Sequence, residues 1–421
     1  MDYSSQSECQ RQAVSIQGLP ATSQCATRPG QPTAQDIQSR AISTLRRISW
    51  SIPVTVGITR DDLGGFVNYY IREISTAFYL GSGPAETPYT RYILPMTQSV
   101  RSVRCAVAAS TACHLANRLE DESLKSFSLH LRLRATELLR TELERNSEQP
   151  ELASLVCMLL LAQLDVCSGD CAEFGIHLNA ASIFLKLGGS DRTAGLYIEQ
   201  RIAWLDIMGA TTSSRMPHWS LEDIRASMDR FSIPSGRREW GFDVFYCPID
   251  LFEYLAEITF LYKRQPDSKN ITQEVIEQAI VFGNAIKRWE ASDYSGPRLD
   301  IVEVWRLGIL LYLIRLFRLP DATFNTTNLV SSIFHYARAI PPRTSWGYST
   351  SWPLFQAGLL LPAEENRNKT WLRNMLYTNF YTLGCLHQKL AAEALDQVWG
   401  SGKDWLHVLS DPEFLDRKLI L

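Results

Sequence analysis

The sequence predicts an all-α protein, built as an array of packed antiparallel helical hairpins behind a disordered N-terminal tail. Two observations carry this prediction. From residue 61 onward, apolar residues recur at the i, i+3, i+4, i+7 spacing of amphipathic helices. Runs with period two, which mark β-strands, are nearly absent. No internal repeat of fixed period occurs, so a regular solenoid is not indicated.

Residues 1–45 are predicted to be the disordered tail. They are rich in Ser, Gln, Thr, Ala, Pro and Gly and contain few large apolar residues. Such a segment cannot bury enough apolar surface to offset the entropy lost on ordering. The tail ends at RRISWSIP, where Arg46, Arg47 and Ser49 resemble a site for a basophilic kinase. Ser49 is therefore a phosphorylation candidate, although such patterns are common by chance.

The first helices should follow this tail directly. Asp61 and Asp62 can cap a helix whose apolar residues continue until GSGPAETP (81–88) breaks it. Residues 96–118 are dense in Ala, Ser, Val and Cys, which suits a buried helix packed closely against its neighbours. Residues 122–145 repeat Leu at helical spacing, with Arg and Glu on the other face.

A central buried helix is predicted at residues 151–167, which are apolar on nearly every side. SGD (168–170) ends it, and a second helix over 173–187 ends at a Gly-Gly C-cap. The two should form a hairpin. Further helices are predicted at 195–211, 243–263, 273–290, 300–318, 326–340, 367–392 and 394–409.

One polar stretch interrupts this series. Residues 213–240 are irregular, contain Pro and read as a long surface loop. The loop either separates an N-terminal from a C-terminal helical half or is an excursion within one domain. We therefore expect a single all-α domain over 46–421, with a subdivision near 213–240 left open.

Composition excludes several classes of protein. The chain has 421 residues, of which 45% are hydrophobic and 21% are charged, as is ordinary for a soluble globular protein. Its net charge of −3 gives no global argument for nucleic acid or an anionic membrane. No run of eighteen apolar residues is present, and the first residues lack the apolar core of a signal peptide. We expect a location in the cytosol or nucleus.

The cysteines do not indicate a metal or redox site. Cys167 and Cys171 are spaced C-x3-C, and His177 follows in the next helix. Structural zinc usually needs a second close pair of ligands, and thioredoxin-like motifs need C-x2-C. The nine cysteines of the chain should mostly be buried thiols in a reducing compartment. We predict no metal and no cofactor.

Catalytic motifs are absent from the sequence. There is no G-x-S-x-G elbow, no P-loop and no H-E-x-x-H, and the seven histidines are scattered. If the chain were an enzyme, His177 and His387 would be weak candidates for an acid–base group beside an Asp or Glu.

Binding surfaces are equally sparse. The basic pairs Arg46-Arg47 and Arg237-Arg238 are isolated, so direct nucleic-acid binding is not expected. Aromatic residues gather towards the C-terminus. They either belong to the hydrophobic core or line a pocket for an apolar ligand. As the lining of such a pocket we predict Phe174, His177, Trp305, Trp352 and Phe355.

Several stretches together resemble the fungal-specific transcription factor domain, the all-α regulatory region that follows the Zn₂Cys₆ DNA-binding cluster in many fungal regulators. The middle is most similar: LLLAQLDVCSGDCAEFGIHLNAASIFLKLGG resembles the family's helix, short turn and helix carrying a His-Leu-x-x-Ala step, here from His177. The resemblance covers about residues 60–410. The other similar stretches, in the family's order, are NYYIREIS, the segment 87–118, AWLDIMGATTSSRMP, WPLFQAG and ALDQVWGSGKDWLHVL.

One departure from the family is important. Its zinc cluster needs six cysteines that open as C-x2-C-x6-C, whereas the first sixty residues hold only Cys9 and Cys25. The resemblance therefore implies regulation without autonomous DNA binding.

The resemblance implies a nuclear regulator or coregulator of a fungal metabolic gene cluster, expected to serve secondary metabolism. Its expected partners are a DNA-binding transcription factor or a second copy of the chain, and an apolar small molecule in a helical pocket; no membrane is expected. The alternative is an enzyme of a fungal biosynthetic pathway that uses the same pocket. A histidine and a carboxylate within hydrogen-bonding reach in that pocket would favour the enzyme.

Overall fold

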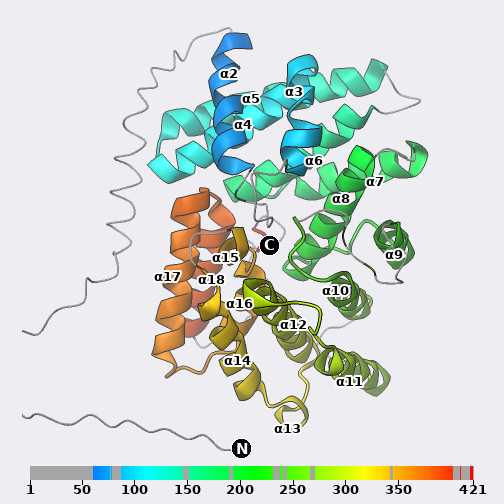
Figure 1. The fold of residues 1–421 in the computed structure, drawn as a ribbon, viewed down its shortest axis with the longest axis vertical. Coiled ribbons are helices and arrows are strands. Elements are labelled where there is room, and N and C mark those ends of the chain that lie inside the picture. The colour runs from blue at the N-terminus through cyan, green and yellow to red at the C-terminus, as the bar shows by residue number, and fades with distance from the viewer. Residues whose placement is uncertain are drawn as a thin grey trace, which may run out of the picture.

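The computed structural model describes residues 60–75, 77, 87–145, 151–188, 193–230, 238, 240, 244–265, 271–341, 345–401, 408 and 418–420. Helices make up its regular structure, and no β-strand forms in these ranges, which confirms the all-α prediction (Figure 1). The predicted tail over 1–45 and Ser49 lie outside the described residues. Of the helices described, none is long and apolar enough to cross a membrane.

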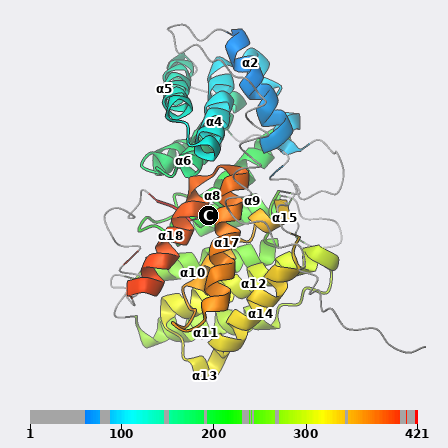
Figure 2. The same cartoon turned by 90° about the vertical axis from the view of Figure 1, so that its left-hand side faces the viewer.

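The N-terminal helices form one end of the molecule (Figure 2). Its centre is α4, whose alanines at 106, 108, 109 and 112 are fully buried and allow close contact with α2, α5 and α6. The helices of this end are α2 (Arg60–Tyr69), the π-helical turns η1 (Tyr70–Ile74) and η2 (Tyr89–Ile93), α3 (Met96–Ser99), α4 (Arg101–Leu119) and α5 (Glu122–Arg145).

The predicted central hairpin is present. Helix α6 (Leu152–Ser168) is buried along nearly its whole length, and Gly169 ends it with φ 71°. Helix α7 (Phe174–Gly188) then folds back against α6. Glycine adopts a left-handed φ most readily, which explains why the SGD turn stops the helix. Helix α8 (Thr193–Thr211) packs against both and leads to the other end of the molecule (Figure 1).

The C-terminal helices form the opposite end around α12, which contacts α10, α11, α14 and α16. Almost every residue of α12 from Ile301 to Phe317 is buried. The helices of this end are α9 (Leu221–Asp229), α10 (Ile249–Lys263), α11 (Gln273–Arg288), α12 (Gly296–Phe317), α13 (Asp321–Phe324), α14 (Thr326–Ala339), α15 (Ser345–Tyr348), α16 (Ser351–Gly358), α17 (Asn366–Leu383) and α18 (Leu386–Ser401).

Several segments differ from the sequence prediction, which gave no helix at α13, α15 or α16. The stretch 213–240, predicted as loop, contains α9, which begins with a capping box between Ser220 and Asp223. The single helix predicted over 367–392 is divided into α17 and α18 by Gly384, whose φ is 61°.

The last two helices return to the N-terminal end, where α17 contacts α4 and α18 contacts α6. The amide of Asn117 on α4 fixes this contact, because its Nδ2 donates to the carbonyls of Cys167 (3.0 Å) and Gly384 (2.7 Å). A partly enclosed space is thereby left between the two ends of the molecule.

Candidate functional site

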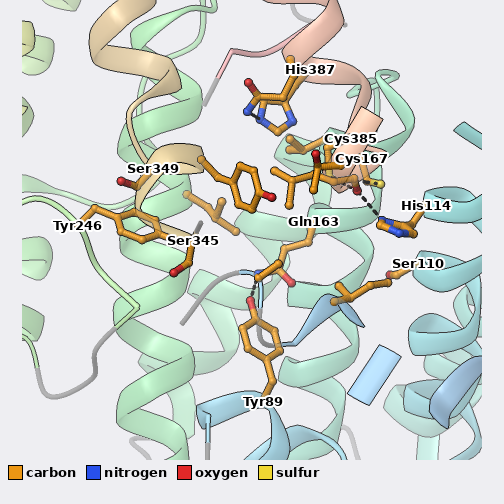
Figure 3. Close-up of a pocket in the computed structure, with 18 of the residues that line it drawn as sticks. Tyr89, Ser110, His114, Gln163, Cys167, Tyr246, Ser345, Ser349, Cys385 and His387 are labelled. Atoms are coloured by element: carbon orange, nitrogen blue, oxygen red, sulfur yellow. Dashed lines mark hydrogen bonds between the residues drawn. The ribbon is translucent and has the colours of Figure 1, made fainter. Parts of the chain in front are cut away.

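That space is a cavity of about 470 Å³, which lies where the two ends of the molecule meet (Figure 3). Its wall is formed by residues from η1, η2, α4 and α6 on one side and from α8, α12, α15, α17 and α18 on the other. Small-molecule sites in proteins typically enclose about 300–1,000 Å³. The size and the central position make this cavity the candidate site.

Aromatic rings supply much of the wall. Trp204 on α8 and Trp305 on α12 meet edge to face with ring centroids 5.4 Å apart. They are held from behind, because Phe252 stacks on Trp204 at 4.8 Å and Trp352 stacks on Trp305 at 5.5 Å. The rings are therefore fixed before any ligand arrives. Further lining rings are Tyr70, Tyr89, Tyr246 and Tyr348.

Polar groups are interspersed among these rings. Gln163 on α6 donates from Nε2 to the hydroxyl of Tyr89 on η2 at 2.8 Å, which joins two elements on the same side of the cavity (Figure 3). The indole Nε1 of Trp305 is buried and has no hydrogen-bond partner. Other polar lining residues are Ser110, Ser345, Ser349, Thr382 and Gln388.

Positive charge exceeds negative charge in the wall. Arg118 and Arg201 both line the cavity, whereas Glu73 is the one acidic residue among the described lining residues. Arg118 donates from Nη1 to the hydroxyl of Tyr69 (3.2 Å) and to Nε2 of His114 (3.3 Å). Arg201 lies close enough to the hydroxyl of Tyr89 for the two to interact. Among the described residues, no carboxylate lies within 4.0 Å of either guanidinium.

His114 is a neutral structural member of the wall. Its Nδ1 bonds to the carbonyl of Leu383 and its Nε2 to the hydroxyl of Tyr69 at 3.3 Å, so α4 is tied to the end of α17. Burial lowers the pKa of His114 to about 3, and the neighbouring charge of Arg118 acts in the same direction.

Two thiols and a histidine form another part of the wall. The sulfurs of Cys167 and Cys385 lie 3.7 Å apart, and His387 follows on α18 (Figure 3). The hydrogen bond between the two sulfurs lowers the pKa of the Cys385 thiol to about 6; His387 acts in the same direction and burial opposes it. In the part of the chain that the structure describes, no group of three His, Cys, Asp or Glu residues is arranged to hold a metal ion.

The structure brings two of the sequence-predicted site residues to the cavity, Trp305 and His387. Trp352 lies one layer behind Trp305 and donates from Nε1 to Oγ1 of Thr211 at 2.8 Å. Phe174 and Phe355 are buried in the core and do not line the cavity.

His177 belongs to a separate polar cluster between α6 and α7. Its Nε2 lies 3.8 Å from Glu173 and 4.0 Å from Asp165, and Arg132 bridges the same two carboxylates at 2.8 Å each. Burial lowers the pKa of His177 to about 4, and burial raises that of Asp165 to about 8 despite Arg132. This cluster holds the hairpin to α5 and does not line the cavity.

The cavity lacks the pair that would favour catalysis. His387 contacts Nε2 of Gln388 at 2.8 Å, and none of the described carboxylates forms an ion pair with it. The geometry thus supplies enclosure, rings and charge for binding, but no histidine–carboxylate pair within the cavity.

Sequence reasoning missed Arg201, Tyr89 and Tyr246 as lining residues. One signal was present: Arg201 interrupts the otherwise apolar face of YIEQRIAWLDIM, and an arginine there must face a polar or hollow environment. The tyrosines carry no such signal, because their positions depend on how distant helices meet.

Comparison with known proteins gives one match. A family described as "Fungal specific transcription factor domain" matches residues 65–417, which is most of the chain. No curated protein and no solved structure matches the sequence.

Proposed function

Because the chain belongs to the family of fungal-specific transcription factor domains, we propose that it is a transcriptional regulator or coregulator of a fungal metabolic gene cluster, serving secondary metabolism. The family match over residues 65–417 is the observation that carries this proposal. The same match supports a nuclear location as part of this proposal.

A DNA-binding partner, or a second copy of the chain, completes the regulator in this proposal. Seven cysteines lie in the core or at the cavity wall, and their spacing in the sequence does not match C-x2-C-x6-C. The remaining two, Cys9 and Cys25, are too few for one. The net charge of −3 also gives no general attraction to DNA.

The cavity is the proposed effector site. It lies between two groups of helices that meet through α17 and α18, so a bound molecule would contact both ends of the domain. A ligand that binds one arrangement of these ends more tightly than another shifts the population of the two. Transcription would then follow the concentration of a metabolite.

Gene deletion combined with promoter occupancy tests the regulator proposal. In the organism that encodes the protein, deletion should change the transcripts of a contiguous set of biosynthetic genes. The epitope-tagged full chain should be enriched at their promoters in chromatin. If the transcripts are unchanged after deletion, the proposal that the protein is a regulator is wrong.

A second measurement separates coregulator from direct DNA binder. The purified full chain should not retard the same promoter fragments in a gel at 150 mM salt, and nuclear extract from the deletion strain should restore retardation. If the purified chain retards the fragments alone, the partner is unnecessary and that part of the proposal is wrong.

A further inference from the structure

Arg201 lines the cavity and has no carboxylate counterion among the residues that the structure describes. Its guanidinium interacts with the hydroxyls of Tyr89, Tyr197 and Tyr246, and its Nε is buried without a hydrogen-bond partner. Tyrosine hydroxyls are neutral near pH 7, and burial raises the pKa of Tyr197 and Tyr246 further. The positive charge is therefore solvated by neutral dipoles alone.

Removing a charge from water is unfavourable unless an opposite charge accompanies it. Three other arginines follow this rule, since the half-buried Arg132, Arg215 and Arg306 each contact a carboxylate. Arg201 departs from it and lines the cavity. A charge kept at such a position, next to an enclosed space, indicates that its partner comes from outside the chain.

Two other groups point to the same kind of partner. The Nε1 of Trp305 and the Nε of Arg118 are buried donors without acceptors, and both residues line the cavity. Together with Arg201 they offer hydrogen bonds to an acceptor-rich group. The neighbouring rings of Trp204 and Tyr246 offer flat apolar surface.

We propose that the cavity binds a planar aromatic molecule carrying one anionic group, whose charge pairs with Arg201 while its rings lie against Trp204 and Trp305. Arg118 adds the second positive charge. This inference specifies the chemical class of the effector and rests on the proposed effector role only for its biological meaning, not for the binding itself.

A matched pair of fluorescent probes tests the proposal on the purified full chain. The anionic probe is 8-anilinonaphthalene-1-sulfonate, and the neutral probe is N-phenyl-1-naphthylamine, which has the same rings without the sulfonate. Wild-type protein should bind the anionic probe more tightly. Arg201→Gln should weaken the anionic probe roughly tenfold or more and leave the neutral probe within about twofold. Arg288→Gln, at an exposed position on α11, should change neither.

The binding of the two probes to R201Q decides whether Arg201 pairs with an anion. If R201Q leaves the affinity for the anionic probe unchanged, or weakens both probes equally, Arg201 does not pair with an anion and the proposal is wrong. Should R201Q fail to fold, competition on wild-type protein decides instead. There 2-naphthoate should displace the neutral probe and 2-naphthamide should not; equal displacement overturns the proposal.

Thermal stability separates this role from a purely structural one. If Arg201 awaits an external anion, the empty R201Q protein should melt at a temperature equal to or above that of the wild type. A lower melting temperature, with unchanged preference for the anionic probe, would make Arg201 a structural tether of the tyrosines. Because these measurements use no DNA, they remain valid if the regulator proposal fails.

Discussion

At the scale of single residues, buried charges in this protein serve different purposes. Asp206 is fully buried on α8, yet it is saturated: it pairs with Nη1 of Arg215 at 2.7 Å and accepts the backbone N–H groups of His218 (2.7 Å) and Trp219 (3.0 Å). These bonds fix the turn after α8. Arg201, on the same helix, has no comparable ion pair with a described residue.

The Asp206 network should therefore be strongly stabilising. Asp206→Asn keeps the shape but leaves the Arg215 guanidinium, 17% exposed, without its counterion. We expect a loss of roughly 3–5 kcal/mol in unfolding free energy by urea titration. Arg140→Gln, which breaks an exposed pair with Glu144, should cost less than about 1 kcal/mol. Equal costs for both variants would contradict the account.

His114 should make stability depend on pH. Its folded pKa is lowered to about 3 by burial, whereas an unfolded histidine has a pKa near 6.5. The unfolded state thus takes up a proton first as pH falls, so stability decreases from about pH 6.5 down towards pH 3. His114→Asn should make the unfolding free energy depend less steeply on pH between pH 4 and 6. The change in slope should correspond to the uptake of up to about one proton fewer on unfolding. Parallel pH profiles would show that His114 does not titrate on unfolding.

Cys385 should be unusually reactive. Its pKa of about 6, set mainly by the Cys167 hydrogen bond, makes it largely thiolate at pH 7. Iodoacetamide labelling, read by peptide mass spectrometry, should rise through pH 6 and level off above about pH 7. Cys167→Ala removes the hydrogen bond and should move this rise to higher pH. A Cys385 profile that still climbs through pH 8.5 in wild type would refute this.

At the scale of elements, periodicity identified most helices because it reports which face is buried. It succeeded for α4, α5 and α6, where buried residues recur or fill the whole surface. It failed at the junction of α17 and α18, because apolar residues continue across Gly384 and the break depends on one backbone angle. It also missed α9, whose Ser220 capping box was the available signal.

The Gly384 junction can be tested directly. Gly384 has φ 61°, and a Cβ there would collide with the carbonyl oxygen of His114. Gly384→Ala should destabilise the protein by more than about 1–2 kcal/mol, because strain and collision add. Gly400→Ala on α18, where a Cβ meets nothing within 4 Å, should stabilise it by up to about 1 kcal/mol. Thermal melts of the two variants shifted in the same direction would be inconsistent with this geometry.

At the scale of the whole molecule, the sequence predicted the fold class and the family resemblance but only part of the cavity. Trp305 was predicted as a lining residue, whereas His387 was named only as a weak acid–base candidate and not as part of the lining. Arg201 and the tyrosines were not predicted, because the wall combines helices more than 300 residues apart in sequence, from η1 to α18. Such a meeting depends on how the two ends pack, which no local pattern records.

The most direct test joins the cavity to gene expression. Three strains would be compared by RNA sequencing: wild type, deletion, and one in which Arg201→Gln replaces the native residue, with protein levels checked by immunoblot. We predict that R201Q accumulates normally yet changes transcripts of the gene set that responds to deletion. If deletion changes those transcripts and R201Q matches wild type, the protein regulates without the cavity. If deletion changes nothing, the protein is not the regulator proposed here.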